Sequence, residues 1–308
     1  MSEFDRLWAG EVDRIAKNVR LRVFQHTVEQ RGGYLSQACS SGQILGALYH
    51  GLMNLPALDK PLLPDSWTGV PGPGHPARTG IKFNSNGQPG YDRFVLSPAQ
   101  YALVLYAVLI ETGRMDERGM KDYNRDGSSV EMIGAEHSPG MEVTTGSLGQ
   151  GISQASGAAM GLRLKGETGR VFVFLSDGEC QSGEFWEALQ AASFHRQDNL
   201  ILVVDRNGCQ CDGVMDPVMN IEPFDDRFRA FGCACVRIPG HDPLALAAAL
   251  DTPHEGKPLV VVCDTDPCYQ MEFLRERHPK FHYIRFTQPG QWEDYRDRCA
   301  AMAKEAGQ

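Results

Sequence analysis

The sequence is poor in three features, and each shortage argues against a class of protein. The longest apolar run, Tyr101 to Ile110, is far short of the roughly 20 residues that a membrane-spanning helix needs. Lys and Arg number 30 against 39 Asp and Glu, a net charge of -9 that disfavours a broad nucleic-acid-binding surface. No G-x-G-x-x-G follows the strand predicted at residues 170–175, which disfavours an NAD-binding domain. We therefore expect neither a membrane nor a nucleic-acid partner.

Disulfide and zinc patterns are also missing. The nine cysteines include two C-x-C pairs but no C-x-x-C pair, so their spacing fits neither a zinc site nor a small disulfide-bonded domain. The first residues are acidic and contain no apolar segment typical of a signal peptide. We therefore expect reduced thiols and a cytoplasmic protein.

What the sequence does contain is an alternation of strands and helices after Asp92. Short apolar runs predict buried strands at residues 93–96, 170–175, 200–205, 234–238 and 258–263. Segments between them predict helices, one of them in the small-residue stretch from Gly146 to Leu164. Continuous apolar strands separated by helices indicate an α/β fold, doubly wound, with a mostly parallel sheet and helices on both faces.

The remaining segments flank this alternation. An amphipathic pattern predicts a helix over about residues 3–30, and a second helix is predicted from Ser40 to Leu52. The Pro- and Gly-rich residues 54–91 predict a long loop, which in a compact domain usually has a function or is mobile. We expect one domain, residues 1–289, that includes the N-terminal helical segment, followed by a C-terminal helix at residues 290–308.

Two polar turns stand directly after predicted strands. Asp177 follows the strand at 170–175, and Asn207 follows the strand at 200–205. Because ligands of doubly wound sheets bind at the carboxyl ends of the strands, we expect both side chains at one crevice. Asp-Gly and Asn-Gly are also common turn dipeptides, but the matching positions, with a helix starting near Gly183 between them, favour binding. Carboxylate and amide oxygens suit Mg²⁺ or Ca²⁺, and the free amides of a helix start suit a phosphate, so the residues predict a metal–diphosphate site.

Four segments, in order along the chain, resemble one enzyme family. They are Asp92-Arg93-Phe94-Val95-Leu96-Ser97, Glu142-Val143-Thr144-Thr145-Gly146-Ser147-Leu148-Gly149-Gln150-Gly151, Asp177-Gly178-Glu179 with Asn207 beyond the next helix, and Gly240-His241-Asp242. The third segment is similar to the thiamine diphosphate motif. As a set they resemble the N-terminal, thiamine diphosphate-binding half of a transketolase.

The resemblance implies thiamine diphosphate as the cofactor, held through Mg²⁺ or Ca²⁺. The implied metal ligands are the side chains of Asp177 and Asn207 and the backbone carbonyl of Cys209, and the other implied cofactor-binding residues are Gly178, Glu179, Gly146 and Leu148. Gly146 and Leu148 would lie near the aminopyrimidine ring. Glu187 matches a family glutamate in a carboxylate network between two active sites, and the alternative for it is an exposed position on a helix.

The histidines that contact the sugar in this family are replaced at several positions. Tyr34 and Gln100 stand where the family carries histidines, and neither side chain titrates near neutral pH as histidine does. His137 and His282 are candidate replacements, with an ordinary surface or packing histidine as the alternative for each. His282 resembles a late family histidine near the thiazolium ring. We expect catalytic contributions from His282, His137, Glu187 and Gln100.

The resemblance implies transfer of a two-carbon ketol unit from a ketose or ketose phosphate to an aldehyde. In this family the glutamate that activates the cofactor belongs to a second, pyrimidine-binding domain, and the chain ends near where that domain would begin. We therefore expect a partner subunit that supplies it, with two copies of each chain. Two alternatives stay open: a 2-oxoacid-decarboxylating component, similar to that of pyruvate dehydrogenase, that passes an acyl unit to a carrier, and a non-catalytic scaffold subunit.

Overall fold

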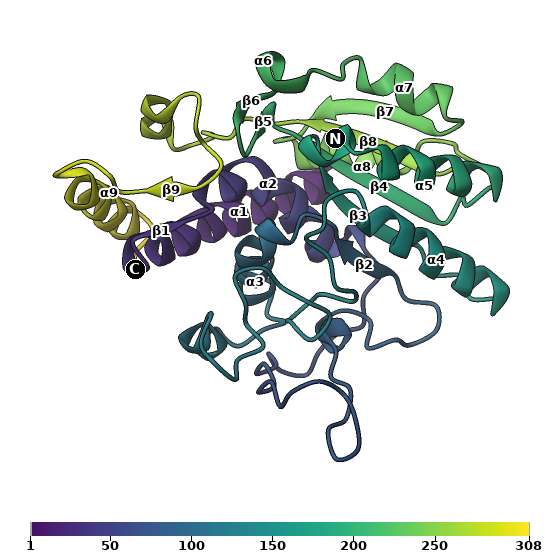
Figure 1. Cartoon of the computed structure of the whole chain (residues 1–308), viewed down its shortest axis with the longest axis horizontal. Helices are drawn as coiled ribbons and strands as arrows, with labels where there is room; N and C mark the ends of the chain where they lie inside the picture. Colours follow the sequence, from purple (N-terminus) through teal and green to yellow (C-terminus); the bar gives the residue numbers. More distant parts are fainter. Residues whose placement is uncertain (1, 308) are drawn as a thin grey trace.

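A five-stranded parallel sheet forms the centre of the computed structural model, which describes residues 2–307 (Figure 1). Its strands, in spatial order, are β2 (Arg93–Leu96), β3 (Val171–Ser176), β4 (Leu200–Arg206), β8 (Leu259–Asp264) and β7 (Ala234–Pro239). Every neighbouring pair in the sheet is parallel. The five predicted strands are therefore confirmed with small shifts at their ends, and so is the α/β fold.

Helices cover both faces of the sheet because side chains alternate along each strand. Phe172 and Phe174 point into one apolar core, and Val171 and Val173 point into the other. The first core lies under α1 (Glu3–Glu29), α2 (Leu35–Ala47), α3 (Ala102–Glu111) and α8 (Pro243–Leu250). The second lies under α4 (Gly151–Leu164), α5 (Gly183–Phe194) and α7 (Phe224–Ala230). The predicted doubly wound arrangement is confirmed.

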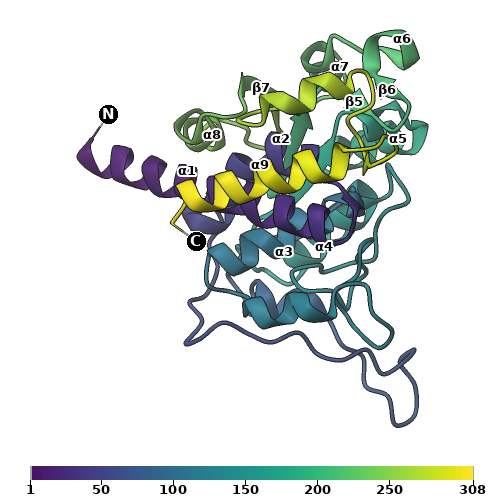
Figure 2. The same ribbon diagram turned by 90° about the vertical axis from the view of Figure 1, so that its left-hand side faces the viewer.

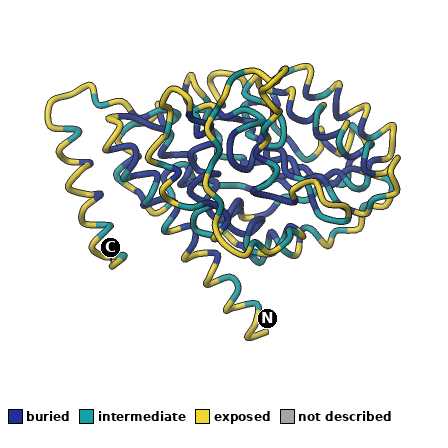
Figure 3. Tube along the Cα trace, turned by 90° about the horizontal axis from the view of Figure 1, so that it is seen from below, coloured by how far each residue is buried: buried dark blue, intermediate teal, exposed yellow. Residues whose placement is uncertain are grey.

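The two terminal helices pack against each other. The helix α1 begins with a capping box, in which Ser2 Oγ accepts from the Asp5 amide at 3.1 Å and Asp5 Oδ2 accepts from the Ser2 amide at 2.8 Å. The helix α9 (Gln291–Glu305) lies along α1 (Figure 2), and Trp292 Nε1 donates to the Val28 carbonyl at 2.9 Å. Buried residues gather in the middle of the molecule, whereas the N-terminal end of α1 and much of α9 are exposed (Figure 3).

The start of α2 corrects its prediction. The helix begins at Leu35, not at Ser40, and continues into a π-helical turn at Leu48–Leu52. The prediction took Ser40 as the start of the helix, but Ser40 lies within α2, and every residue of α2 is buried. The Ser40 hydroxyl instead donates to the Asp205 carboxylate at 2.6 Å, so this buried polar group is satisfied by a hydrogen bond in the interior.

The glycine-rich segment before α4 is a loop, although the predicted helix included it. The helix begins only at Gly151. Gly146 and Gly149 have φ values of +104° and +87°, which favour glycine and interrupt a helix. The Thr145 hydroxyl donates to the Leu96 carbonyl at 2.6 Å, and this bond holds the loop against the end of β2.

Short elements complete the chain. They are β1 (Gly32–Gly33) paired antiparallel with β9 (Ile284–Arg285), β5 (Cys209–Gln210) paired antiparallel with β6 (Gly213–Val214), α6 (Met215–Met219), and 3-10 helices at Gly80–Phe83, Ala99–Tyr101, Glu117–Asp122, Gly178–Gln181 and Glu272–Arg277. The predicted long loop, residues 54–91, contains only the first of these 3-10 helices. Arg114 fixes that loop by donating to the carbonyls of Pro56 at 3.2 Å and Asn84 at 2.8 Å. No helix within residues 2–307 is long and apolar enough to cross a membrane.

Candidate cofactor and metal site

A pocket of about 820 Å³ opens where β3 and β4 end, at the C-terminal edge of the sheet. Its lining comes from segments far apart in the sequence and includes Tyr34, Gln37, Gln100, Gly146, Leu148, Gly178, Asn207, Cys209 and His282. This edge is where open α/β sheets bind their ligands. Most of the predicted site residues therefore meet at one pocket.

Asp177 stands at the end of β3 and connects it to the neighbouring strand. Its side chain is fully buried, and its two oxygens accept from the backbone amides of Gly178 at 2.8 Å and Gly208 at 2.6 Å. Burial, and then repulsion from the Asp205 carboxylate, raises the pKa of Asp177 to about 8. A cation beside Asp177 would offset both effects, because it stabilises the ionised carboxylate.

Asn207 is held by its amide nitrogen. The nitrogen Nδ2 donates to the Tyr101 hydroxyl at 3.1 Å and to Asp205 Oδ2 at 3.2 Å. The oxygen Oδ1, on the other side of the amide, accepts from the Cys209 amide at 2.9 Å. The bond from Gly208 to Asp177 brings this turn against the end of β3, so the two predicted ligands lie at adjoining strand ends.

The chemistry of these residues fits a hard divalent cation. The donor set comprises the Asp177 carboxylate, the Asn207 amide oxygen and the backbone carbonyl of Cys209, and oxygen donors suit Mg²⁺ or Ca²⁺. Residues 2–307 contain no group of three or more His, Cys, Asp or Glu side chains that could hold a metal. At Gly178 a Cβ atom would lie 3.3 Å from the Gln210 Cβ, so a side chain there would narrow the pocket.

Glu179 does not line the pocket, although the motif predicts that it binds the cofactor. Its buried carboxylate accepts from the Ser97 hydroxyl at 2.6 Å, the Gly149 amide at 3.2 Å and the Ser176 amide at 3.0 Å. Burial raises the pKa of Glu179 to about 7, although these hydrogen bonds lower it. The residue supports the two loops that form the pocket, and its oxygens are occupied by those loops.

Gly146 and Leu148 form an apolar side of the pocket. A Cβ atom at Gly146 would lie 3.2 Å from Ile133 Cγ2 and 3.3 Å from Ala99 Cβ, so the loop approaches its neighbours closely. Leu148 is 43% exposed and Ile133 is 40% exposed. Exposed apolar side chains beside polar groups suit a flat heteroaromatic ring.

His282 and Gln100 both line the pocket. The His282 ring packs edge-on against Tyr34, with ring centroids 5.4 Å apart, and its backbone carbonyl accepts from Gln37 Nε2 at 3.0 Å. Burial lowers the pKa of His282, which favours the neutral imidazole. Gln100 Oε1 and Gln37 Oε1 are buried without a hydrogen-bond partner among residues 2–307. Two residues of the pocket lining therefore have amide oxygens without a hydrogen-bond partner.

His137 and Glu187, also predicted to be catalytic, are placed elsewhere. The His137 ring stacks on Trp67 with centroids 4.1 Å apart, and its Nε2 lies 3.2 Å from Glu131 Oε2. It connects the long loop to the segment before α4 and does not line the pocket. Glu187 is exposed on α5. The structure thus does not bring these two side chains to His282.

Comparison with known proteins decides the family. The model of the family described as "Transketolase, thiamine diphosphate binding domain" matches residues 83–271, a span that contains both Asp177 and Asn207. This chain belongs to the transketolase family. The resemblance stated from its motifs is confirmed, and the chain carries the thiamine diphosphate-binding domain of that family of transferases.

Several curated members of the transketolase family are similar to this chain. An uncharacterized transketolase family protein of Sinorhizobium fredii is 40% identical over 209 residues, which cover 67% of this chain and 74% of the relative. A 6-deoxy-6-sulfo-D-fructose transketolase subunit of a Clostridium species is 33% identical over 182 residues, covering 58% and 66%. An apulose-4-phosphate transketolase subunit of Actinobacillus succinogenes is 30% identical over 197 residues, covering 63% and 71%.

Solved transketolase structures share the fold. A Pichia stipitis transketolase in complex with sedoheptulose-7-phosphate superposes with a TM-score of 0.68 at 21% identity, over 96% of this chain. The Campylobacter jejuni transketolase gives a TM-score of 0.66 at 18% identity, over 98% of this chain. This chain spans only 45% and 47% of those two chains.

Sequence reasoning missed one buried group in this transketolase-family site. Asp205, two residues before Asn207, is fully buried and accepts from Ser40, Tyr101 and Thr265 as well as from Asn207. The strand-end rule that identified Asn207 applies equally to Asp205. The sequence therefore contained a signal for this residue. Its partners come from α2, from the turn before α3 and from the segment after β8, and no local pattern connects them.

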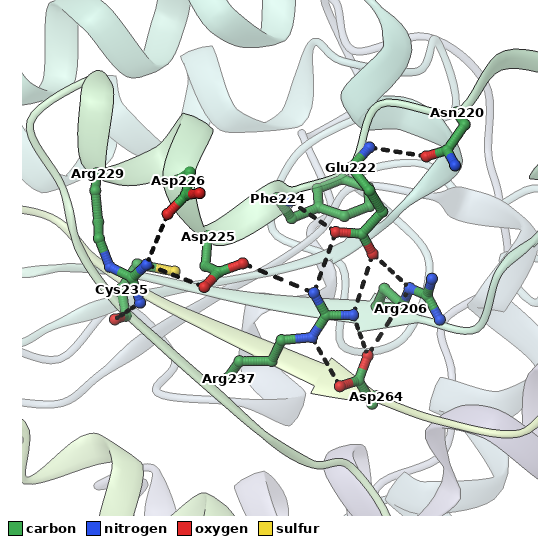
Figure 4. A network of polar contacts seen from close by, with 10 residues as sticks. All are labelled: Arg206, Asn220, Glu222, Phe224, Asp225, Asp226, Arg229, Cys235, Arg237 and Asp264. Carbon is green, nitrogen blue, oxygen red and sulfur yellow. Dashed lines mark hydrogen bonds and ion pairs between the residues drawn. The ribbon is translucent and has the colours of Figure 1, made fainter.

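A network of charged residues lies beside the metal-site turn (Figure 4). Arg237 of β7 donates to both oxygens of Asp264, at the end of β8, at 2.8 Å each, and to Glu222 at 3.1 Å. Arg206, the residue before Asn207, donates to the same Glu222 carboxylate at 3.0 Å. The network therefore ties the ends of three strands to one loop.

Proposed function

We propose that this chain is the cofactor-binding subunit of a transketolase-like enzyme assembled from two kinds of chain. It transfers a two-carbon ketol unit from a ketose or ketose phosphate to an aldehyde. The observation that carries the proposal is the coincidence of the family match with the Asp177–Asn207 pair at the pocket. Two relatives named as transketolase subunits, for a sulfo-sugar and a sugar phosphate, support a ketose donor.

The residues proposed to hold the metal and the diphosphate are at the strand ends that border the pocket. Asp177, Asn207 and the Cys209 carbonyl hold Mg²⁺ or Ca²⁺, and Gly178 lets the diphosphate approach the backbone. Gly146 and Leu148, which line the pocket, would contact the aminopyrimidine ring. When bound, thiamine diphosphate supplies the carbon nucleophile and the electron sink for cleavage of the ketose.

Substrate contacts come from the deeper side chains of the pocket. The neutral imidazole of His282 exchanges a proton with a substrate hydroxyl, since burial keeps its pKa low. Gln100 accepts a hydrogen bond from the sugar through its unpartnered Oε1. Glu187 takes part through a contact with another subunit, in keeping with its exposure on α5. His137 has no part in this proposal, because it stacks on Trp67 outside the pocket.

The activating carboxylate comes from a partner subunit. Among the described residues that line the pocket, Asp212 is the one acidic side chain, and it is exposed. Two relatives that are named as transketolase subunits support a partner. We propose that the partner supplies a pyrimidine-binding domain, with two copies of each chain. Nine free thiols support a reducing location such as the cytoplasm.

Product analysis of the assembled enzyme tests this function. The chain is expressed with a pyrimidine-domain subunit from the same organism and incubated with ketose phosphates and aldehyde acceptors, or with 2-oxoacids. The proposal predicts a ketose longer by two carbons than the acceptor, with no release of carbon dioxide. Carbon dioxide from a 2-oxoacid would support the decarboxylating alternative. Full ketol transfer by the chain alone would contradict the proposed need for a partner subunit.

A further inference from the structure

Asp205 is a buried carboxylate with no place in the proposed ligand set. It lies at the end of β4, has no exposed surface and accepts from four side chains. Its partners are the hydroxyls of Ser40, Tyr101 and Thr265 and the amide nitrogen of Asn207. None of these donors carries a charge. A buried carboxylate held only by neutral donors is costly to keep.

The bonds around Asp205 determine which way the Asn207 amide points. A carboxylate can only accept, so the group facing Asp205 Oδ2 at 3.2 Å must be the nitrogen of Asn207. The Tyr101 hydroxyl uses its single proton on Asp205 Oδ2 at 2.8 Å, and its oxygen is left to accept from the same nitrogen at 3.1 Å. Both contacts therefore require Nδ2 on this side and Oδ1 on the other.

The opposite orientation would reverse the chemistry at the metal. A flipped amide would place Oδ1 against the oxygens of Asp205 and Tyr101, where no proton is available for it. It would also turn two N–H groups, which cannot coordinate a cation, toward the ligand side. Second-layer hydrogen bonds of this kind orient metal ligands in other sites, and their loss typically weakens metal binding by 10–100-fold.

We propose that Asp205 and Tyr101 are positioning residues that direct the amide oxygen of Asn207 toward the metal. This inference rests on the proposed function, since it assumes that Asn207 is a metal ligand. It goes beyond it by assigning a role to two residues that do not themselves bind the cation. This positioning role predicts a different effect of Asn207→Asp on metal binding from the one expected by counting ligand oxygens alone.

The deciding variant is Asn207→Asp. A carboxylate provides oxygen ligands at least as good as those of an amide, so ligand chemistry alone predicts unchanged or tighter metal binding. The positioning role predicts the reverse, because a carboxylate at 207 cannot donate to Asp205 or Tyr101 and is repelled by Asp205. We expect Mg²⁺-dependent affinity for thiamine diphosphate to fall by at least about tenfold. The exchanged pair Asp205→Asn with Asn207→Asp restores one amide and one carboxylate, and we expect it to recover much of the loss.

A conservative pair of variants removes a single hydroxyl. Tyr101→Phe deletes one acceptor of the Asn207 nitrogen, and we expect a loss of several-fold in the same affinity. Tyr49→Phe is the matched control: Tyr49 is also buried, and its hydroxyl donates to an asparagine, Asn84, at 2.9 Å, but it does not line the pocket. We expect Tyr49→Phe to leave the affinity unchanged.

Binding is measured on the full chain by isothermal titration of thiamine diphosphate at several Mg²⁺ concentrations. The thermal unfolding midpoint of each variant without ligand shows that its fold is intact. Weakened binding by Asn207→Asp and Tyr101→Phe, recovery in the exchanged pair and normal binding by Tyr49→Phe support the assignment. Wild-type affinity in both Asn207→Asp and Tyr101→Phe overturns it and leaves the proposed function standing. Absence of Mg²⁺-dependent binding by the wild-type chain overturns both.

Discussion

The backbone amide of Gly149 donates to Glu179 Oε2 at 3.2 Å, and this bond joins two loops on different sides of the pocket. Gly149 belongs to the glycine-rich loop beside Leu148, and Glu179 follows Asp177, the proposed metal ligand. The same carboxylate also receives the amide of Ser176 at 3.0 Å. The geometry of the glycine-rich loop and of the end of β3 therefore depends on one buried acid.

Substituting this acid tests how strongly it holds the loops together. In Glu179→Gln the carboxamide has one oxygen, so its NH₂ group must face the amide of either Gly149 or Ser176. A buried donor left unpaired costs about 1–3 kcal/mol, and we expect the free energy of unfolding to fall by that amount in urea titrations. Glu255, which is exposed, provides the control Glu255→Gln. Equal stability of the two variants would show that Glu179 does not hold the loops.

The pH dependence of stability should contain a contribution from His26. Burial lowers the pKa of His26 to about 4, whereas an unfolded histidine titrates near 6.5. As the pH falls, the histidine of the unfolded chain is therefore protonated before that of the folded chain. This contribution to stability is complete above about pH 6.5 and is lost as the pH falls toward 4. With 1.36 kcal/mol for each pKa unit, the full loss is about 3 kcal/mol.

Replacing His26 should remove this part of the acid sensitivity. We expect His26→Phe to lose less free energy of unfolding than the wild type between pH 7.5 and pH 4.5, measured in urea at each pH. The exposed residue His75 supplies the control His75→Phe, which should follow the wild type. If the His26→Phe curve runs parallel to that of the wild type, the neutral buried state of His26 is refuted.

The charged network beside the metal-site turn should contribute more than an ordinary surface pair. Arg237 contacts Asp264 through two hydrogen bonds and also bonds to Glu222 (Figure 4). Removing it leaves two carboxylates close together, and we expect Arg237→Met to lower the free energy of unfolding by about 1–2 kcal/mol. Arg14, which forms an exposed ion pair with Glu11 one helical turn away, supplies the control Arg14→Met, with an expected loss of about 0.5 kcal/mol or less. Similar losses in both variants would argue against a cooperative network.

The proximity of the two proposed metal ligands could be predicted because their signal is local. Asp177 and Asn207 each follow a strand whose apolar run is legible in the sequence, and parallel strands bring their ends to one edge. The same rule applies to Asp205. However, an acidic residue next to a turn looks like an ordinary turn residue until its hydrogen-bond partners are known.

Other parts of the site depend on contacts between distant segments. His137 stacks on Trp67, and the two residues belong to different loops. No sequence pattern near either residue predicts this contact. Ser40 was predicted to begin a helix because serine is common at helix starts, whereas here it lies inside one and bonds to Asp205. Glu179 was assigned to the cofactor from its motif, yet its oxygens are occupied by the loops around it.

The most direct test of the central claim is a thiamine diphosphate titration of the wild-type chain and of Asp177→Ala, with Mg²⁺ and with a chelator. Asp177 is the acidic ligand of the proposed site, and its buried carboxylate joins the ends of β3 and β4. We predict saturable, Mg²⁺-dependent binding by the wild type and its loss in Asp177→Ala, with Asp212→Ala binding like the wild type. Equal binding by Asp177→Ala and the wild type, or binding that ignores the chelator, would contradict the account.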